Sequence, residues 1–304
     1  MSSVLYDVPG PRAVARNRVL GIVTVVVIVA LLAFVIWRFA EAGQFTARKW
    51  ELLSYTAVWA QIGEGLLATL RAFALAAVGS LVLGFALAIG RLSDHAWVRL
   101  PVAWITEILR AIPVLVAMML LYYGLPVLGM RVSPYWAVVI GLVIYNGSVI
   151  AEAIRAGVAS LPRGQSEAGY AVGLRKSGVM RLVLLPQAIR AMMPVIIAQL
   201  VVTLKDTALG FIITYPELLY IARQLGRNIL YEAPIIPFTL VTGAIYILIC
   251  MALSYVAYRV ERGLKRSPKV QTANAAMAPG RVHEEGTDTQ ILAQQVDVDG
   301  SDRK

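Results

Sequence analysis

Several uncharged apolar runs, each long enough to cross a bilayer as one helix, constrain this chain more than any other feature of its sequence. The clearest run is VLGIVTVVVIVALLAFVIW at 19–37, which follows Arg12, Arg16 and Arg18. About 20 apolar residues are needed to span the hydrocarbon core of a membrane. Because backbone groups in lipid must be hydrogen-bonded within their own segment, such runs predict membrane-spanning helices.

Together the apolar runs predict an all-α, polytopic membrane protein. The composition agrees, since 59% of the residues are hydrophobic, 15% are charged and the mean hydropathy is +0.71. A soluble domain carries about 25% charged residues. We expect about six spans, at about 19–37, 66–90, 100–124, 134–151, from 182 onward with a break at 205–206, and 237–258.

The first span has an alternative interpretation as a secretory signal, because Ala40-Glu41-Ala42 resembles a cleavage site. Its apolar core is longer than the ~7–15 residues usual in signals, which favours a retained anchor. We therefore predict three parts. Residues 1–64 hold an N-terminal tail, the first span and a polar interfacial linker (41–64), residues 65–260 form the main transmembrane domain with a loop at 152–185, and residues 261–304 form a disordered tail.

The distribution of Lys and Arg predicts the orientation of the chain. With the N-terminus inside, most cations fall on the cytosolic side, and few fall outside. Those assigned to the cytosol are Arg12, Arg16, Arg18, Arg91, Arg99, Arg155, Arg163, Arg175, Lys176, Arg181, Arg190 and the group from Arg259 onward. We expect the spans to lie in the plasma membrane, and the bias places both termini and the 152–185 loop in the cytosol. It also accounts for the net charge of +10, so the charge does not indicate nucleic-acid binding.

Within the cytosolic loop, residues 162–186 (PRGQSEAGYAVGLRKSGVMRLVLLP) predict a helical hairpin. Residues 165–171 are expected to form a short helix, with the Glu167 carboxylate in its first turn near the positive helix end. Gly173 is expected to end it in a left-handed turn, and a second helix starts with Arg175 and Lys176. Small residues keep the first helix thin, so that it suits insertion into a groove on a cytosolic protein. The candidate residues for this docking are Gly164, Glu167, Ala168, Gly169, Gly173 and Leu174.

Small residues also recur every four positions along the second span, and so share one helix face. They are Ala72, Ala76, Ser80, Gly84 and Ala88. Such a stripe allows close helix packing, either within this chain or against a partner subunit.

Charges within the spans are costly to bury and therefore mark candidate functional positions. Glu107 and Arg110 lie three residues apart, so an ion pair between them is expected. On a straight span Arg110 lies near mid-depth, where it either faces a translocation path or serves a structural ion pair. Lys205 and Asp206 interrupt the fifth span; they either expose backbone ends to a cavity or form a local salt bridge.

Catalytic and cofactor motifs are absent from the sequence. His95 and His283 have no partner motif, Cys250 is the single cysteine, and the glycines at 164–178 are not followed by the Lys-Ser of a phosphate-binding loop. We therefore expect no enzyme activity, no metal site, no cofactor and no ATP binding in this chain.

Residues about 62–262 resemble the membrane subunits of ABC importers for polar amino acids. The matching segments are GLLATLRAFALA (65–76), EILRAIPVLV (107–116), GQSEAGYAVGL (164–174), LPQAIRAMMP (185–194), LKDTALG (204–210) and PELL (216–219). The 164–174 segment resembles the EAA loop by which such permeases grip their ATPase, although Gly169 stands where the family usually has alanine. The N-terminal segment and the long tail resemble glutamate permeases of high-GC Gram-positive bacteria.

The resemblance implies a type I ABC importer permease fold with one extra N-terminal span. It also implies three partners: an ATP-binding subunit, an extracytoplasmic binding protein and a second permease subunit, identical or homologous. The substrate implied is a polar amino acid, with glutamate or a related acidic or amide amino acid favoured. Two alternatives from other classes are an ion-coupled secondary transporter, which predicts paired broken helices, and an integral membrane enzyme, which predicts intramembrane His, Asp or Glu clusters.

Overall fold

The computed structural model describes residues 10–265, and within that range the chain is helical and contains no strand. The expectations for residues 1–9 and for the polar tail from 266 lie outside the described residues. The α-helices are α1 (Pro11–Glu41), α2 (Ala47–Glu51), α3 (Thr56–Arg91), α4 (Ala96–Ala111), α5 (Val114–Met119), α6 (Pro134–Ala159), α7 (Arg163–Ala171), α8 (Lys176–Gly178), α9 (Leu185–Asp206), α10 (Leu218–Gly226) and α11 (Ile235–Lys265). The chain divides into a compact unit ending at Ser254 and a second unit from Tyr255.

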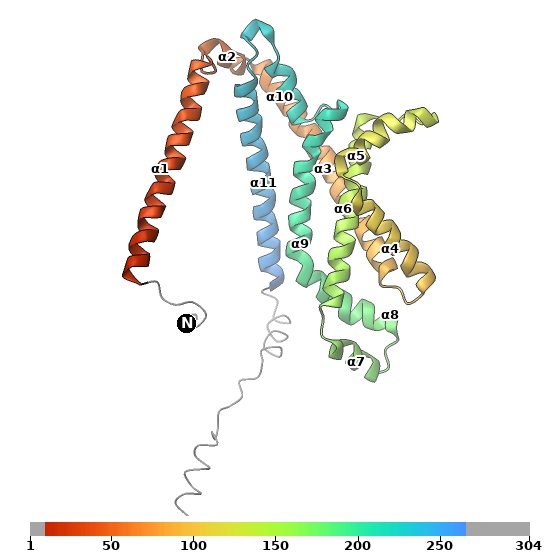
Figure 1. The fold of residues 1–304 in the computed structure, drawn as a ribbon. Coiled ribbons are helices and arrows are strands. Elements are labelled where there is room, and N and C mark those ends of the chain that lie inside the picture. The colour runs from red at the N-terminus through yellow and green to blue at the C-terminus, as the bar shows by residue number, and fades with distance from the viewer. Residues whose placement is uncertain (1–9, 266–304) are drawn as a thin grey trace, which may run out of the picture. The chain divides into compact units, whose positions relative to one another are not determined.

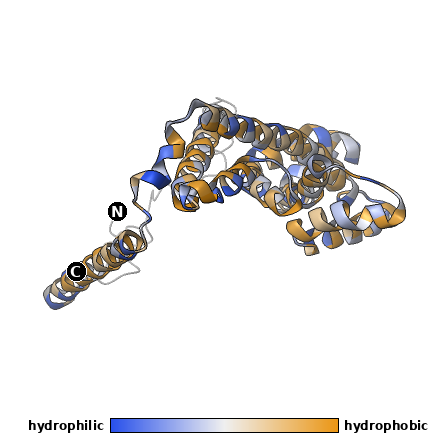
Figure 2. Ribbon diagram, turned by 90° about the horizontal axis from the view of Figure 1, so that it is seen from above, coloured by the Kyte–Doolittle hydropathy of each residue, from blue (hydrophilic) through white to orange (hydrophobic). Residues whose placement is uncertain are grey.

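Five helical segments are long and apolar enough to cross a membrane. A bent pair, α4 with Val114–Leu128 (the α5 segment), brings the number to six within the described residues. The five are Arg12–Glu41, Thr56–Arg91, Pro134–Ala159, Lys176–Ile213 and Ile235–Arg259. Hydrophobic residues dominate these long helices (Figure 2). The expected count of about six spans is therefore confirmed, although several helices extend well beyond the apolar runs.

The second span begins at Thr56, ten residues before the expected start at 66, so the proposed linker is shorter than 41–64. Val58 and Ile62 explain the extension, because both are buried against Leu218 of α10 and Phe238 of α11. Burying these apolar side chains stabilises the added turns. The sequence did not predict these turns, because polar residues lie beside the apolar ones. The remaining linker contains α2 and a short 3₁₀ turn, Leu52–Ser54.

Helix α3, which carries the small-residue stripe, lies against α6 within the same chain (Figure 1). A Cβ atom on Gly84 would lie 2.9 Å from the carbonyl oxygen of Gly147, so the two helix backbones are in close approach there. Ala72, Ala76, Ser80 and Ala88 are fully buried. Contact within the chain, rather than with a partner, therefore accounts for the stripe.

The third span is not the straight helix expected over 100–124. Instead, α4 and the α5 segment meet at an angle of 94°. Pro113 causes the break, since proline lacks an N–H and disfavours helical backbone at the residue before it. Accordingly Ile112 is extended, with φ −79° and ψ 120°. Beyond the bend, α5 continues as a π-helix (Leu120–Gly124) and a 3₁₀ turn (Leu125–Leu128).

The fifth span changes its helix type twice. A π-helix (Val179–Leu184) precedes α9, and a 3₁₀-helix (Thr207–Ile213) follows it. The α-helix does end at Asp206, as expected, but the chain stays helical, so no free backbone ends are presented there. Lys205 and Asp206 form no ion pair with each other among the residues that the structure describes.

Candidate functional site: the loop hairpin and the charges behind it

The loop hairpin consists of α7, a turn at 172–175, and α8 with its π-helical continuation to Leu184. It lies beyond the ends of α6 and α9 (Figure 1). Because α7 begins at Arg163, two residues earlier than expected, Glu167 lies in the second turn. The expected interaction of its carboxylate with the helix N-terminus is therefore wrong, since that effect falls off within the first turn.

Gly173 ends α7 as predicted, with a left-handed backbone at φ +83°. The Leu174 N–H donates to the Gly169 carbonyl at 3.1 Å, and the Gly173 N–H donates to the Tyr170 carbonyl at 2.9 Å. This pair of bonds is the Schellman arrangement, which satisfies carbonyls left unpaired at a helix end. Leu174 is half-buried and contacts Gly178 in the second arm of the hairpin.

One face of α7 is exposed and carries mostly small residues. Gly164, Glu167, Ala168 and Ala171 are all exposed, and their spacing of three and four residues places them on one side of the helix. We call these four residues the docking face. Glu167 makes no ion pair within the described residues, so its carboxylate is available to a partner.

Gly169, which was expected to contribute to the docking face, lies on the opposite side of α7. It is buried, and a Cβ atom there would come within 2.8 Å of a methyl carbon of Val179, itself fully buried. Glycine at this position thus lets the two arms of the hairpin pack closely. The hairpin is tied to α9 as well, because the Gln187 side-chain amide donates to the Gln165 side-chain oxygen at 3.3 Å.

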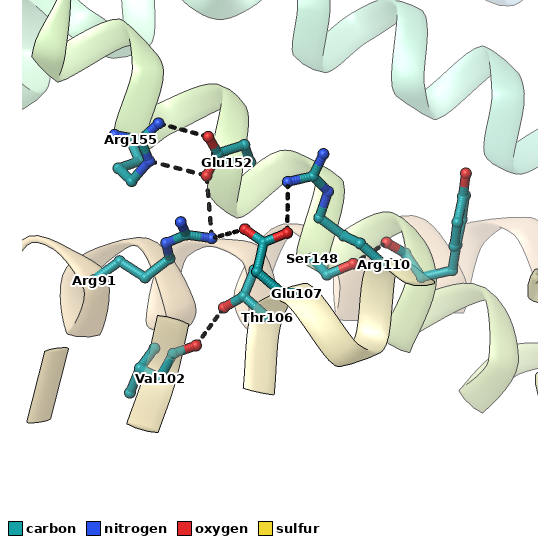
Figure 3. A network of polar contacts seen from close by, with 9 residues as sticks. Arg91, Val102, Thr106, Glu107, Arg110, Ser148, Glu152 and Arg155 are labelled. Carbon is teal, nitrogen blue, oxygen red and sulfur yellow. Dashed lines mark hydrogen bonds and ion pairs between the residues drawn. The ribbon is translucent and has the colours of Figure 1, made fainter. Parts of the chain in front are cut away.

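Behind the hairpin, five charged residues form an ion-pair network across α3, α4 and α6 (Figure 3). The Arg91 guanidinium lies 3.0 Å from the Glu107 carboxylate and 3.1 Å from the Glu152 carboxylate. Arg110 pairs with Glu107 at 3.5 Å, which confirms the expected ion pair, and Arg155 pairs with Glu152 at 2.6 Å. Arg91 is the most buried of the three cations, with 12% of its side chain exposed.

The network changes the position assigned to Arg110. Glu107 reaches Arg91, the last residue of α3, and Val102 of α4 packs against Gly90. Arg110 therefore lies near the end of α3 rather than at the mid-depth of a straight span, because α4 crosses the helix ends before the chain bends at Pro113. Sequence reasoning missed Arg91, Glu152 and Arg155 as partners; Glu152 and Arg155 stand three residues apart, which was the available signal.

Nearer the start of α3, a buried carboxylate joins α10 to α11. Glu217 accepts hydrogen bonds from the N–H groups of Leu219 and Tyr220, at 2.8 and 2.7 Å, and so caps the start of α10. It also accepts one from the hydroxyl of Tyr246 in α11 at 2.7 Å. Burial raises the pKa of Glu217 to about 7. The N–H of Leu218 donates to Thr69 of α3 at 3.1 Å, which completes the junction.

Comparison with known proteins gives consistent matches. Residues 80–266 match the family described as binding-protein-dependent transport system inner membrane component. The chain is 40% identical over 230 residues to the glutamate transport system permease protein GluD of Corynebacterium glutamicum. This match covers 73% of this chain and 82% of GluD. It is 32% identical over 217 residues to the glutamine transport system permease protein GlnP of Escherichia coli, covering 69% of this chain and 97% of GlnP.

Among solved structures, an amino acid ABC transporter crystallised with histidines superposes with a TM-score of 0.64 at 28% identity. The match covers 69% of this chain and 97% of the transporter chain. The fold is therefore that of an ABC importer permease.

Proposed function

The chain belongs to the family of inner-membrane components of binding-protein-dependent transport systems, and from this premise we propose that it is the permease subunit of an ATP-driven importer for a polar amino acid. Its helices make it a multi-pass membrane protein. Glutamate, or a related acidic or amide amino acid, is the substrate we propose. The support for that choice is the similarity to GluD over most of both chains, together with the similarity to a glutamine permease.

The observation that carries the proposal is the exposed docking face of α7. A surface of Gly164, Ala168 and Ala171 offers no bulky side chain, so a groove on another protein can approach the helix backbone closely. Glu167 adds one unpaired carboxylate to that surface, which suits a cation on the partner. We propose that an ATP-binding subunit binds here, hydrolyses the ATP, and moves the loop hairpin.

Two further partners complete the proposal. The family description implies a separate binding protein that delivers the substrate from outside the membrane. A second permease subunit, identical or homologous, would supply the other half of the path. The Lys/Arg bias supports an orientation in which the loop hairpin and both termini lie in the cytosol.

Four charged residues are proposed to lie on the substrate path. Glu107 and Arg110 each keep a solvent-accessible side chain, at 55% and 36% exposed, despite their mutual ion pair. Lys205 is exposed and Asp206 half-buried where the α-helix gives way to 3₁₀-helix. A partly neutralised Arg110 favours passage of an anionic solute over tight capture, because Glu107 reduces the local field.

Reconstitution in liposomes tests the proposed function. The chain, purified with the ATP-binding subunit and sister permease encoded beside it, is supplied with the neighbouring binding protein and labelled glutamate, glutamine or arginine. We expect uptake that requires both ATP and the binding protein. Uptake that proceeds without ATP and follows a sodium or proton gradient would instead establish a secondary transporter.

A pair of variants tests the docking face in the same preparation. Ala168→Trp places a large ring on the face and is expected to prevent retention of the ATP-binding subunit on purification. Ser177→Trp, at an exposed position in α8, is the matched control and should retain it. Equal retention by both variants would exclude α7 as the docking element while leaving the transport assay unaffected.

A further inference from the structure

The loop hairpin is connected to the membrane helix α9 through its second arm. Val179 packs against Gly169, and the π-helix that contains Val179 continues without interruption into α9. The hydrogen bond between Gln187 and Gln165 adds a second tie between α7 and α9. Movement of α7 must therefore act on α9.

A second connection leaves the hairpin at Lys176, directly after its turn. The Lys176 ammonium forms an ion pair with the carboxylate of Asp94. Asp94 lies in the short turn between α3 and α4, which is more than 80 residues away in the sequence. It is the only ion pair between the hairpin and that turn among the residues that the structure describes.

The turn that holds Asp94 is firmly attached to α4. Three residues before Asp94, Arg91 binds Glu107 of α4 at 3.0 Å, while Val102 of α4 packs against Gly90. At the other end of α4 the chain bends by 94° at Pro113. The helical hydrogen-bond pattern is interrupted there, so α4 and α5 are not one rigid helix. Hence α4 can move with the turn and swing relative to α5.

We propose that Asp94 and Lys176 are positioning residues that transmit movement of the loop hairpin to α4, as a second route beside the one through α9. The inference rests on the proposed function, since it assumes that an ATP-binding subunit moves the hairpin. It adds that the same movement displaces Glu107 and Arg110, which lie on α4. The path residues and the ATPase-docking element are thereby linked through one ion pair and one turn.

The exposure of the pair distinguishes this role from a structural one. The side chains of Lys176 and Asp94 are 47% and 58% exposed, and ion pairs exposed to water contribute little to folding. Breaking the pair should leave the protein folded and change only the efficiency of coupling. An interaction of this strength limits the expected change to about two- to five-fold.

The test is a charge exchange, measured as amino acid imported per ATP hydrolysed by the full complex in liposomes. Asp94→Lys and Lys176→Asp, each alone, are expected to lower this ratio by about two- to five-fold. The exchanged variant D94K/K176D should restore the ratio to near the wild-type value, because the ion pair is re-formed with reversed polarity. Two single variants with wild-type ratios would overturn the proposal, and so would an exchange that fails to restore the ratio.

Arg175 provides the matched control. It neighbours Lys176, is exposed, and makes no ion pair within residues 10–265. The variant D94K/R175D carries the same charges as the exchange but on the wrong partner, and it should not restore the ratio. Restoration by this variant would mean that only net charge matters and would overturn the proposal.

Two more measurements separate the remaining outcomes. Loss of the ATP-binding subunit from both K176D and the exchanged variant would assign Lys176 to the ATPase contact and so overturn the proposed route. A wild-type complex that imports nothing with ATP would count against the proposed function itself, before any variant is compared.

Discussion

Gly169 and Val179 lie so close across the loop hairpin that a methyl group on Gly169 would come within 2.8 Å of a Val179 methyl carbon. Val179 is β-branched and fully buried, so it has little freedom to move aside. The glycine therefore serves the packing of the hairpin, and the helix-weakening effect of glycine, up to about 1 kcal/mol relative to alanine, is offset by that fit.

Replacing Gly169 with alanine should consequently weaken the hairpin despite the better helix propensity of alanine. We expect Gly169→Ala to reduce retention of the ATP-binding subunit, since overpacking a filled contact costs about 1–3 kcal/mol. The double variant G169A/V179A removes the obstructing methyl groups and should recover retention. Stronger retention by G169A alone would show that helix propensity outweighs the contact.

Gly173 tests the turn by backbone geometry alone, because a Cβ atom added there would meet no other atom within 4 Å. Valine is a poor fit to the left-handed backbone at φ +83°, whereas asparagine tolerates it. Gly173→Val is expected to insert in the membrane but lose the ATP-binding subunit, and Gly173→Asn should keep it. Co-purification of the two subunits measures both, and equal retention would contradict a role for the left-handed turn.

The same substitution should lower the folding stability of the protein by different amounts at Arg91 and at Arg110. Arg91→Gln leaves the Glu107 and Glu152 carboxylates without their shared cation, which should lower the unfolding free energy by about 1–3 kcal/mol. Arg110 is more exposed and has one longer ion pair, so Arg110→Gln should cost less than about 1 kcal/mol. Thermal unfolding of the purified complexes compares the two directly.

In transport, Arg110→Gln is expected to lower glutamate uptake while the complex stays assembled, because the proposed path then loses a cation that attracts an anionic solute. Arginine uptake by the same preparation provides the control. Loss of assembly would instead make Arg110 structural, and unchanged glutamate uptake would remove it from the path.

Glu217 predicts a pH dependence of folding stability. Its pKa is about 7 in the folded protein, against an ordinary value of 4.5. Between these values the folded state holds the proton that the unfolded state has released, so stability should fall as the pH rises from 4.5 to about 7. Glu217→Gln cannot titrate and should flatten this part of the profile. Glu64→Gln, at an exposed position in α3, is the control and should retain the wild-type slope in detergent melting experiments.

Reporter fusions test the orientation inferred from the Lys/Arg bias. A reporter after Lys269, which lies outside the described residues, should report cytosol. One placed near Arg131, between the α5 segment and α6, should report the outside. A cytosolic signal near Arg131 would reverse the assignment of the loop hairpin and with it the docking proposal.

Local features of the sequence were sufficient to predict that about six spans exist and where α7 ends. The run 19–37 lies within α1, and Gly173 forms the predicted turn, because both depend on interactions between residues at most a few positions apart. The ion pair between Glu107 and Arg110 belongs to the same class, since one helix turn brings the two side chains together.

Other features depended on which helices pack together, and no local pattern could supply them. Val58 and Ile62 extend α3 because Leu218 and Phe238 cover them, and Arg91 meets Glu152 because α3 and α6 lie side by side. Gly169 could be placed only once Val179 was seen against it. The lengths of the apolar runs in the sequence therefore determined how many helices cross the membrane. Tertiary packing decided where α3 begins, what Gly169 faces and which charges meet, because each depends on residues brought together from distant parts of the chain.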